Sequence, residues 1–463
     1  MDAAYSTDRA GASRSALEAP LVLRSSRDLL AAVPYLLGFR PRECVVVVAV
    51  TAEGQIGLVA RTALAELADG SGAGGTAGMA ADVDAVARAA SRVGARLALV
   101  VLYTSAPPGR ARAHAAAVVG ALDESLAPTV DVEAWLVGPQ GYRGLDCVDP
   151  ACCPPQGRPV SELEHGEVGA AFVVAGRAIA ASEEEAHRIR RPSDGVRDRV
   201  AKAAARAQRA RAAASEEAAA PRVPEARAAS GSAGRRGPGR ADALGRWRAE
   251  AYEVWRDLVR QAAAELCERP ATEVELAPAR LGRLAVALAD VPVRDAVLLS
   301  LVPGGREVAD RTAGVVGPGT AGGGHGAGHG TGLGADGGAD GGAGDGIDVE
   351  AATARAIARV VDPRVGVPPD AATADAARVV LEQLVGGAPR RWHAAPLALL
   401  GFLAWWRGDG WLAARRVRES ARQDPGHRLA ALLAGVLEAA VPPGWVSSTR
   451  QPVAAGVARP TVG

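Results

Sequence analysis

The sequence has one lysine and no asparagine: Lys202 is the only lysine among 463 residues. A phosphate-binding loop of the Gly-Lys-Ser/Thr type needs a lysine directly after a glycine, whereas Lys202 follows Ala201. A Cys-His-Asn active site needs an asparagine. Gly-x-Ser-x-Gly and His-Glu-x-x-His motifs are missing too. The composition therefore excludes Walker-type nucleotide hydrolysis and leaves no recognisable catalytic motif.

Long apolar runs are also missing. The longest uncharged apolar run, residues 396–406, is far shorter than the roughly 20 residues that span a bilayer. The first twenty residues carry acids and arginines without the apolar core of an export signal. We therefore expect a cytoplasmic protein with no membrane partner. Five cysteines in such a chain indicate reduced thiols or a metal site more than a disulfide framework.

Strands and helices alternate in the amino-terminal part of the chain. Two strands joined by a short polar link containing Gly54 form a predicted hairpin. Continuous apolar strands that alternate with helices favour a mixed or parallel sheet covered on both faces. The predicted strands are residues 44–50, 56–62, 96–103 and 130–137, and the predicted helices are residues 82–93 and 110–126. We expect an α/β domain, a mixed sheet with flanking helices, over residues 20–196.

The rest of the chain alternates helical and low-complexity segments. An Ala/Arg-rich stretch, residues 197–240, is interpreted as a partly helical linker, because it has few large apolar groups. A helical segment follows at residues 241–302, and an all-α carboxy-terminal domain at residues 348–446. The segments predicted to be disordered are residues 1–19, the Gly-rich tract 303–347 and the tail 447–463.

A tetratricopeptide-like helical hairpin is predicted within residues 396–443. Setting Pro425 at the terminal proline of such a repeat places small residues, including Gly401 and Ala413, where two helices must pack closely. Residues 407–410, Arg-Gly-Asp-Gly, then fall at the turn.

The opening of the first domain resembles a known family. Residues 28–41 read Asp-Leu-Leu-Ala-Ala-Val-Pro-Tyr-Leu-Leu-Gly-Phe-Arg-Pro and lead into a valine-rich strand. This stretch, together with residues 147–157, 291–298 and 397–443, is similar to the actinobacterial domain-of-unknown-function family 4192. That family has no assigned activity, so the resemblance implies no reaction.

Cys147, Cys152 and Cys153, with His165 twelve residues further on, are the strongest chemical grouping in the sequence. Thiolates and an imidazole together can complete a tetrahedral zinc site. The spacing argues against zinc, because adjacent cysteines in extended chain point in different directions and no Cys-x-x-Cys pair is present. A packed turn with buried thiols is the favoured interpretation; metal binding and redox chemistry are the alternatives, and no cofactor is predicted.

The binding candidates are aromatic: Phe402, Trp405, Trp406 and Trp411. On a tetratricopeptide-like hairpin, a second face with such rings lines a peptide groove; in the alternative interpretation, helix 371–385 covers the rings. We therefore expect a protein-binding or adaptor protein, with a protein partner favoured over a small molecule.

Two rival functions remain open. An enzyme or small-molecule binder would use the loops 103–109 and 138–144 at the carboxyl ends of the strands, and a pocket there containing Arg61 or Tyr142 would favour it. A nucleic-acid-associated protein would use the basic linker, but a net charge of +1 gives no overall support for it. The Gly-x-Gly-x-x-Gly match at residues 70–75 begins eight positions after the end of its strand, and we discount it as a dinucleotide site.

Overall fold

The computed structural model describes residues 23, 25–52, 54, 56–64, 75–126, 128–139, 141–154, 156–174, 179–219, 243–315 and 349–446. The termini predicted to be disordered, residues 1–19 and 447–463, lie outside these residues, as does the glycine motif up to Gly74. The chain divides into two compact units. The first unit comprises residues 1–189, 361–368 and 400–463, and the second comprises residues 190–360 and 369–399.

The first unit opens with a capped helix, α2 (Ser26–Leu37). The Ser25 hydroxyl accepts a hydrogen bond from the backbone N–H of Asp28 at 3.2 Å and so caps the amino terminus of α2. Gly38 ends the helix in the left-handed region (φ +77°), which glycine reaches without a Cβ clash. The chain then enters strand β1 (Cys44–Thr51), as the sequence predicts.

Five strands form one mixed sheet in the order β2-β1-β3-β4-β5. The other strands are β2 (Ile56–Ala63), β3 (Ala95–Tyr103), β4 (Asp131–Gly138) and β5 (Gly141–Gly144). The β1–β2 hairpin is antiparallel, whereas β3 and β4 are parallel and are joined through helix α5 (Pro108–Ser125). The predicted mixed sheet is confirmed. The short strand β5 was not predicted, since four residues containing two glycines give almost no strand signal.

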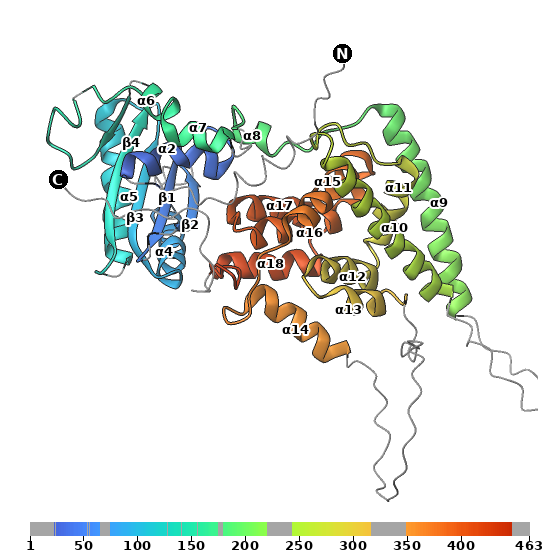
Figure 1. The fold of residues 1–463 in the computed structure, drawn as a ribbon. Coiled ribbons are helices and arrows are strands. Elements are labelled where there is room, and N and C mark those ends of the chain that lie inside the picture. Colours follow the sequence, from blue (N-terminus) through green and yellow to red (C-terminus); the bar gives the residue numbers. More distant parts are fainter. Residues whose placement is uncertain are drawn as a thin grey trace, which may run out of the picture. The chain divides into compact units, whose positions relative to one another are not determined.

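Successive residues of β1 face two different apolar layers. Val46 and Val48 belong to a core with α2 and the short helices α6 (Ser161–Glu164) and α7 (Glu167–Val174). Val45 and Val47 belong to a second core with α4 (Gly75–Arg92) and α5. The sheet is therefore covered on both faces (Figure 1). This coverage explains the uninterrupted apolar run of β1.

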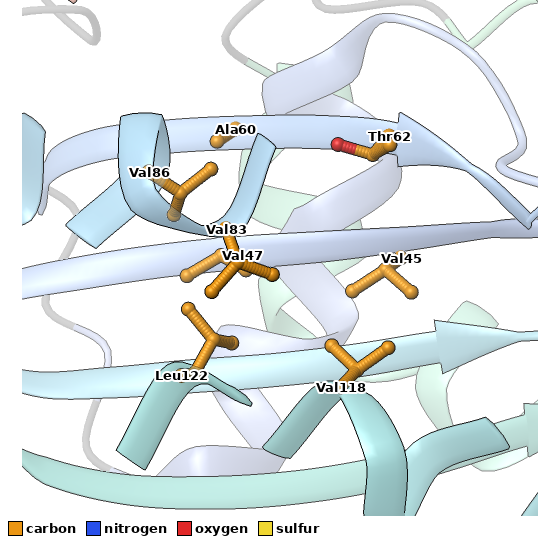
Figure 2. Close-up of a pocket in the computed structure, with 8 residues that line it drawn as sticks. All are labelled: Val45, Val47, Ala60, Thr62, Val83, Val86, Val118 and Leu122. Atoms are coloured by element: carbon orange, nitrogen blue, oxygen red, sulfur yellow. The ribbon is translucent and has the colours of Figure 1, made fainter. Parts of the chain in front are cut away.

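The second face contains a small void. Figure 2 shows the side chains around it, which come from β1, β2, α4 and α5. The void measures about 20 Å³ and is lined by Val45, Val47, Ala60, Thr62, Val83, Val86, Val118 and Leu122. Seven of these eight residues are apolar, so the void is a packing defect and offers no chemistry.

The second unit is helical. Its helices are α9 (Asp194–Ala219), α10 (Ala243–Leu266), α11 (Pro278–Ala287), α12 (Val291–Leu301), α13 (Arg306–Thr312), α14 (Val349–Val361, of which Val361 falls in the first unit) and α15 (Ala371–Gly387). Figure 1 shows α9 running alongside α10 and α11. The linker interpretation is therefore wrong for residues 197–219, because α9 buries Val200, Ala203, Ala204 and Ala207.

The Gly-rich tract was predicted to be disordered from residue 303 onward, and this boundary lies too early in the chain. Residues 303–315 are described and include α13, which buries Val308 and Ala309. Residues 316–348, the remainder of the tract and the residue after it, lie outside the described residues. This helix was not predicted from the sequence, because the apolar residues at 308, 309 and 313 are followed by many glycines.

The last helices of the chain are α16 (Ala394–Trp406), α17 (Gly410–Gln423) and α18 (Arg428–Glu438), preceded by the single turn η1 (Arg390–Trp392). A Cβ atom on Gly401 would lie 3.0 Å from a methyl carbon of Val417 and 3.4 Å from the carbonyl oxygen of Ala413. The predicted close approach of two helices at Gly401 is therefore present. The predicted helical domain 348–446 is divided, because residues 400–446 cluster with the sheet. No helix within the described residues is long and apolar enough to cross a membrane.

The contact between α9 and α11 generates a prediction at Gly282. A Cβ atom there would lie 2.6 Å from the Cβ of Ala203 and 2.8 Å from the backbone nitrogen of Ala204. We expect Gly282→Ala to lower the stability of the second unit by about 1–3 kcal/mol, because the two helices must move apart. Thermal or urea unfolding measures this loss.

The matched control is Gly120→Ala, in the middle of α5, where an added Cβ meets no atom within 4 Å. Alanine favours the helix there by roughly 0.5–1 kcal/mol. A Gly282→Ala variant as stable as Gly120→Ala would contradict the close approach of α9 and α11.

Candidate functional site

A cavity of about 750 Å³ opens at one end of the sheet in the first unit. It lies where the parallel strands β3 and β4 end and where β1 begins. Helix α2 forms one wall through Leu30, Ala31, Pro34 and Tyr35. The remaining lining residues are Arg40, Pro41, Arg42, Glu43, Tyr103, Thr104, Ser105, Val137, Gly138, Pro139, Val160, Leu163, Glu164 and Ile179.

The position of the cavity follows from the topology of the sheet. Adjacent parallel strands place their following loops side by side at their carboxyl ends, where α/β proteins commonly bind ligands. Thr104 and Ser105 follow β3, and Gly138 and Pro139 lie at the end of β4. These loops are the ones that the sequence predicts to converge. Arg61 and Tyr142, the residues expected in such a pocket, do not line it.

Glu43 fixes the loop at the mouth of the cavity. Its carboxylate accepts hydrogen bonds from the Ser105 hydroxyl (2.5 Å), the Ser105 backbone N–H (2.7 Å) and the Thr104 hydroxyl (3.0 Å). The Ser105 hydroxyl makes the largest contribution to holding the pKa of Glu43 below its usual value. Glu43 also has a φ of +43°, which is rare for a residue with a Cβ and is maintained here by these three bonds.

The cavity combines an apolar interior with a charged rim. Leu30, Val137 and Leu163 represent the apolar walls, and they belong to the core beneath the sheet. On the rim, the Arg40 guanidinium is paired with the Glu164 carboxylate. Within the described part of the chain, Arg42 has no ion-paired partner and its side chain is exposed. The rim therefore carries two positive and two negative side chains, of which the guanidinium of Arg42 is the one directed to no ion-paired partner among the described residues.

The three predicted cysteines meet at a separate place in the same unit. Their sulfur atoms all lie within 4.8 Å of one another, with Cys147 and Cys152 half-buried and Cys153 buried. The expectation that adjacent Cys152 and Cys153 diverge is wrong, because the chain turns here: the Cys153 N–H donates to the Asp149 carbonyl at 2.8 Å. His165 is not part of the group; its exposed ring contacts the Ser161 carbonyl at 2.9 Å.

Two of the thiols have different environments. A hydrogen bond from the backbone of Asp149 makes the largest contribution to lowering the pKa of Cys147. Burial raises the pKa of Cys153 to about 11, although the Gly144 N–H donates to its sulfur at 3.4 Å.

Trp411 belongs to a cluster of arginines and aromatic rings. The guanidinium carbon of Arg61 lies 5.2 Å from the centre of the Trp411 ring and 5.6 Å from that of Phe39. Arg61 is also ion-paired with Glu183 at 2.8 Å, and its side chain is only 9% exposed. The Arg415 guanidinium carbon lies 5.8 Å from the centre of the same tryptophan ring. Trp411 is therefore a contact between α17 and the edge strand β2.

His187, which follows helix α8 (Glu183–Ala186), completes this cluster. The centre of its ring lies 5.3 Å from that of Trp411, and its backbone carbonyl accepts a hydrogen bond from Arg416 at 2.6 Å. Burial lowers the pKa of His187 to about 4, with further lowering by the positive charges of Arg416, Arg415 and Arg61.

The remaining aromatic candidates pack inside the first unit. Phe402, Trp405 and Trp406 are 5%, 4% and 0% exposed. The indole N–H of Trp405 donates to the Val441 carbonyl at 2.9 Å, and that of Trp406 donates to the Val367 carbonyl at 3.1 Å. An open aromatic groove on this face is therefore not formed. Whether these residues contribute to partner binding stays a prediction.

The comparisons with known proteins identify a family. The profile described as "Domain of unknown function (DUF4192)" matches residues 27–313 and 353–444, which is most of the chain. The chain belongs to this family. No curated protein and no solved structure matches it. The two matched ranges include the cavity, the three cysteines and the carboxy-terminal helices, so these features belong to the part of the chain that defines DUF4192 membership.

Several cavity residues escaped the sequence analysis. Arg40, Arg42 and Glu43 lie in the turn between α2 and β1, where the Gly-Phe-x-Pro motif drew attention to the fold alone. A usable signal was present at Thr104 and Ser105, because two hydroxyl residues directly follow an apolar strand. Glu43 carried no comparable signal, since its partners lie about sixty residues away.

The arginine–aromatic cluster predicts a dependence of stability on pH. The folded state keeps His187 neutral down to a pKa of about 4, whereas the ordinary value is 6.5. Its contribution to stability is therefore fully present above pH 6.5 and is lost as the pH falls towards 4. We expect Tm to fall over this window less steeply in His187→Gln than in the wild type.

The matched control is His165→Gln, which removes an exposed histidine and should follow the wild-type pH profile. Carboxylates also change Tm with pH in all three proteins. The measurement therefore compares the slope of Tm against pH between one protein and another. Equal slopes for wild type and His187→Gln would contradict the buried neutral imidazole.

The buried tryptophan gives a second prediction. Trp406→Ala should lower the free energy of unfolding by about 3–5 kcal/mol, because it removes a fully buried ring and leaves the Val367 carbonyl without its donor. The control is Leu432→Ala on α18, whose side chain is 60% exposed and should cost less than about 0.5 kcal/mol. Chemical denaturation measures both losses of stability. An unchanged denaturation midpoint in Trp406→Ala would contradict the burial of this ring and support an exposed groove.

Proposed function

We propose that this DUF4192 protein binds a small organic acid in the cavity at the carboxyl ends of β3 and β4. The observation that carries the proposal is the cavity itself: about 750 Å³, with apolar walls and, on its rim, Arg42, which is not ion-paired with any described residue. Ligand pockets commonly measure about 300–1,000 Å³ and combine apolar walls with a few polar groups. The apolar body of the ligand lies against α2, and its carboxylate or phosphate lies at Arg42.

The partners of the charged rim residues support an anionic ligand. Glu43 is engaged by three donors of Thr104 and Ser105, and Glu164 is engaged by Arg40. Neither carboxylate is then available to a cation, whereas the fork of Arg42 is available to a carboxylate or phosphate. The proposal is a binding function, and no residue around the cavity is assigned a catalytic role.

A cytoplasmic protein-binding or adaptor role, in an actinobacterial protein with a tetratricopeptide-like hairpin, is a separate proposal. The pairing of α16 and α17 at Gly401 supports the hairpin. It has less support than the cavity, because Phe402, Trp405 and Trp406 are packed inside the unit. A nucleic-acid role is weaker still, since α9 uses the described part of the basic segment to pack on α11.

The proposal is tested by ligand-induced stabilisation. Aliphatic and aromatic carboxylates, and their uncharged amides, are screened by thermal shift and then by calorimetry. A ligand at a hundred times its Kd stabilises the folded state by about 2.7 kcal/mol. We expect acids but not the matching amides to raise Tm, and we expect Arg42→Gln to remove the difference between them.

Two further variants make the test specific. Ala31→Phe places a ring in the cavity and should abolish binding of every acid that binds the wild type. Arg110→Gln removes an exposed arginine on α5 that does not line the cavity, and should bind as the wild type does. Binding that survives Ala31→Phe, or acids and amides that bind equally, would refute the proposal.

A further inference from the structure

The loop that carries the three cysteines has almost no apolar core. Residues 145–158 lead away from β5 and return to it. The return is fixed by Tyr142 and Arg158, which exchange two backbone hydrogen bonds of 2.8 Å. Among the described residues of this loop, Cys153 is the only one with a buried side chain, and Val148 is 95% exposed. Leu145, at the start of the loop, packs against the second core, but a loop of this length with so few apolar contacts needs another interaction to hold one conformation.

The sulfur atoms are close enough together to bind one metal ion. Two thiolates on one zinc ion, each with a Zn–S bond of about 2.3 Å, are separated by roughly 3.8 Å. In the loop, all three Sγ atoms lie within 4.8 Å of one another. A contraction of about 1 Å at most brings them to that separation. Side-chain rotation of the half-buried Cys147 and Cys152 can supply this movement without a change in the buried Cys153.

One backbone donor reaches a sulfur of the cluster, and a glycine lets the strand approach it. The Gly144 N–H donates to Cys153 Sγ at 3.4 Å. A Cβ on residue 144 would lie 3.3 Å from the Cβ of Cys147 and 3.7 Å from Cys153 Sγ, so glycine lets β5 approach the cluster. Donors to coordinating sulfurs are the outer contacts that orient metal ligands.

A positive charge reaches the cluster from a distant segment. The Arg27 guanidinium, on α2, lies 3.9 Å from Cys152 Sγ. Three thiolates and one Zn²⁺ carry a net charge of −1, which a neighbouring guanidinium offsets. Arg27 is 125 positions away in sequence, so this contact also fastens the loop to α2.

We propose that Cys147, Cys152 and Cys153 bind one zinc ion as thiolates, with the fourth position open to solvent, and that this ion holds the loop 145–158 against β5. Three Zn–S bonds form and three thiol protons leave to solvent. Zinc is chosen because thiolate sets select soft or borderline metals and because a mononuclear zinc site tolerates a fourth ligand from water. The proposal is independent of the acid-binding cavity, since no cysteine of the cluster lines it.

The test uses the full chain, purified under reducing conditions, loaded with zinc and then dialysed. Elemental analysis should give about one zinc per chain. Cys147→Ser and Cys152→Ser are the primary variants, because both side chains are half-buried and tolerate serine. Each should lose most of the bound zinc. The control is Cys267→Ser, which removes an exposed cysteine just after α10 and should keep one zinc.

Two measurements separate a metal site from a packed turn. Replacement of zinc by Co²⁺ should give the intense visible absorption of a tetrahedral thiolate complex in the wild type and not in Cys147→Ser. Arg27→Gln should weaken zinc binding about 10- to 100-fold, measured by competition with a chromophoric chelator, as changes in outer contacts of metal ligands do.

Three outcomes would overturn the proposal. The first is reduced, zinc-loaded protein that retains only a trace of metal. The second is zinc retained in both Cys147→Ser and Cys152→Ser. The third is a disulfide between two of the three cysteines that persists in protein purified from a reducing lysate, because a cysteine in a disulfide cannot coordinate zinc.

Discussion

The burial of β1 on both faces is the constraint on which the first unit depends. From Cys44 to Val50 every residue of this strand is at most 5% exposed, and the strand pairs with β2 on one side and β3 on the other. Alternate valines therefore belong to two different cores, one with α2 and one with α4 and α5. A shift of one residue in register would exchange these two sets, so the register is strongly fixed.

The fixed register of β1 also determines where the cavity opens. Glu43 immediately precedes the strand, opposite the loops that follow β3, and its unusual backbone conformation is held by Thr104 and Ser105. The amino end of β1 and the carboxyl end of β3 are thereby tied together at one edge of the cavity. The apolar walls above them come from α2, which is placed by its own contacts with β1.

The sequence was informative wherever local pattern determines structure. The hairpin of β1 and β2, the helices α10, α12 and α14, and the close approach at Gly401 follow from periodicity, turns and small residues. It was misleading where burial depends on distant partners. Helix α9 looked like a linker because alanines bury little surface individually, yet a glycine at position 282 lets α11 pack directly on its backbone.

The same contrast between local pattern and distant partners explains which features of the candidate sites were predicted and which were missed. The loops around the cavity were predicted, because the ends of parallel strands must converge, but the charges on its rim were not. The convergence of Cys152 and Cys153 was missed, because it requires the turn from Asp149 to Cys153 and not extended chain. The aromatic residues stand out in the sequence as large apolar side chains, but a sequence cannot say whether a ring faces a groove or its own neighbours.

The edge strand β2 explains why the carboxy-terminal helices cluster with the sheet. An edge strand exposes unpaired backbone groups and needs a cover or a charge to prevent association with other chains. Arg61 supplies a buried charge at this edge, and its guanidinium is held by Glu183 and by the rings of Phe39 and Trp411. Its Nε has no hydrogen-bond partner among the described residues, so the arrangement is not optimised for stability alone. A cluster of this kind contributes specificity: a helix without the Trp411 ring of α17 would remove one of the two aromatic contacts of Arg61, whose charge stays paired with Glu183, and this loss disfavours alternative packing of the edge.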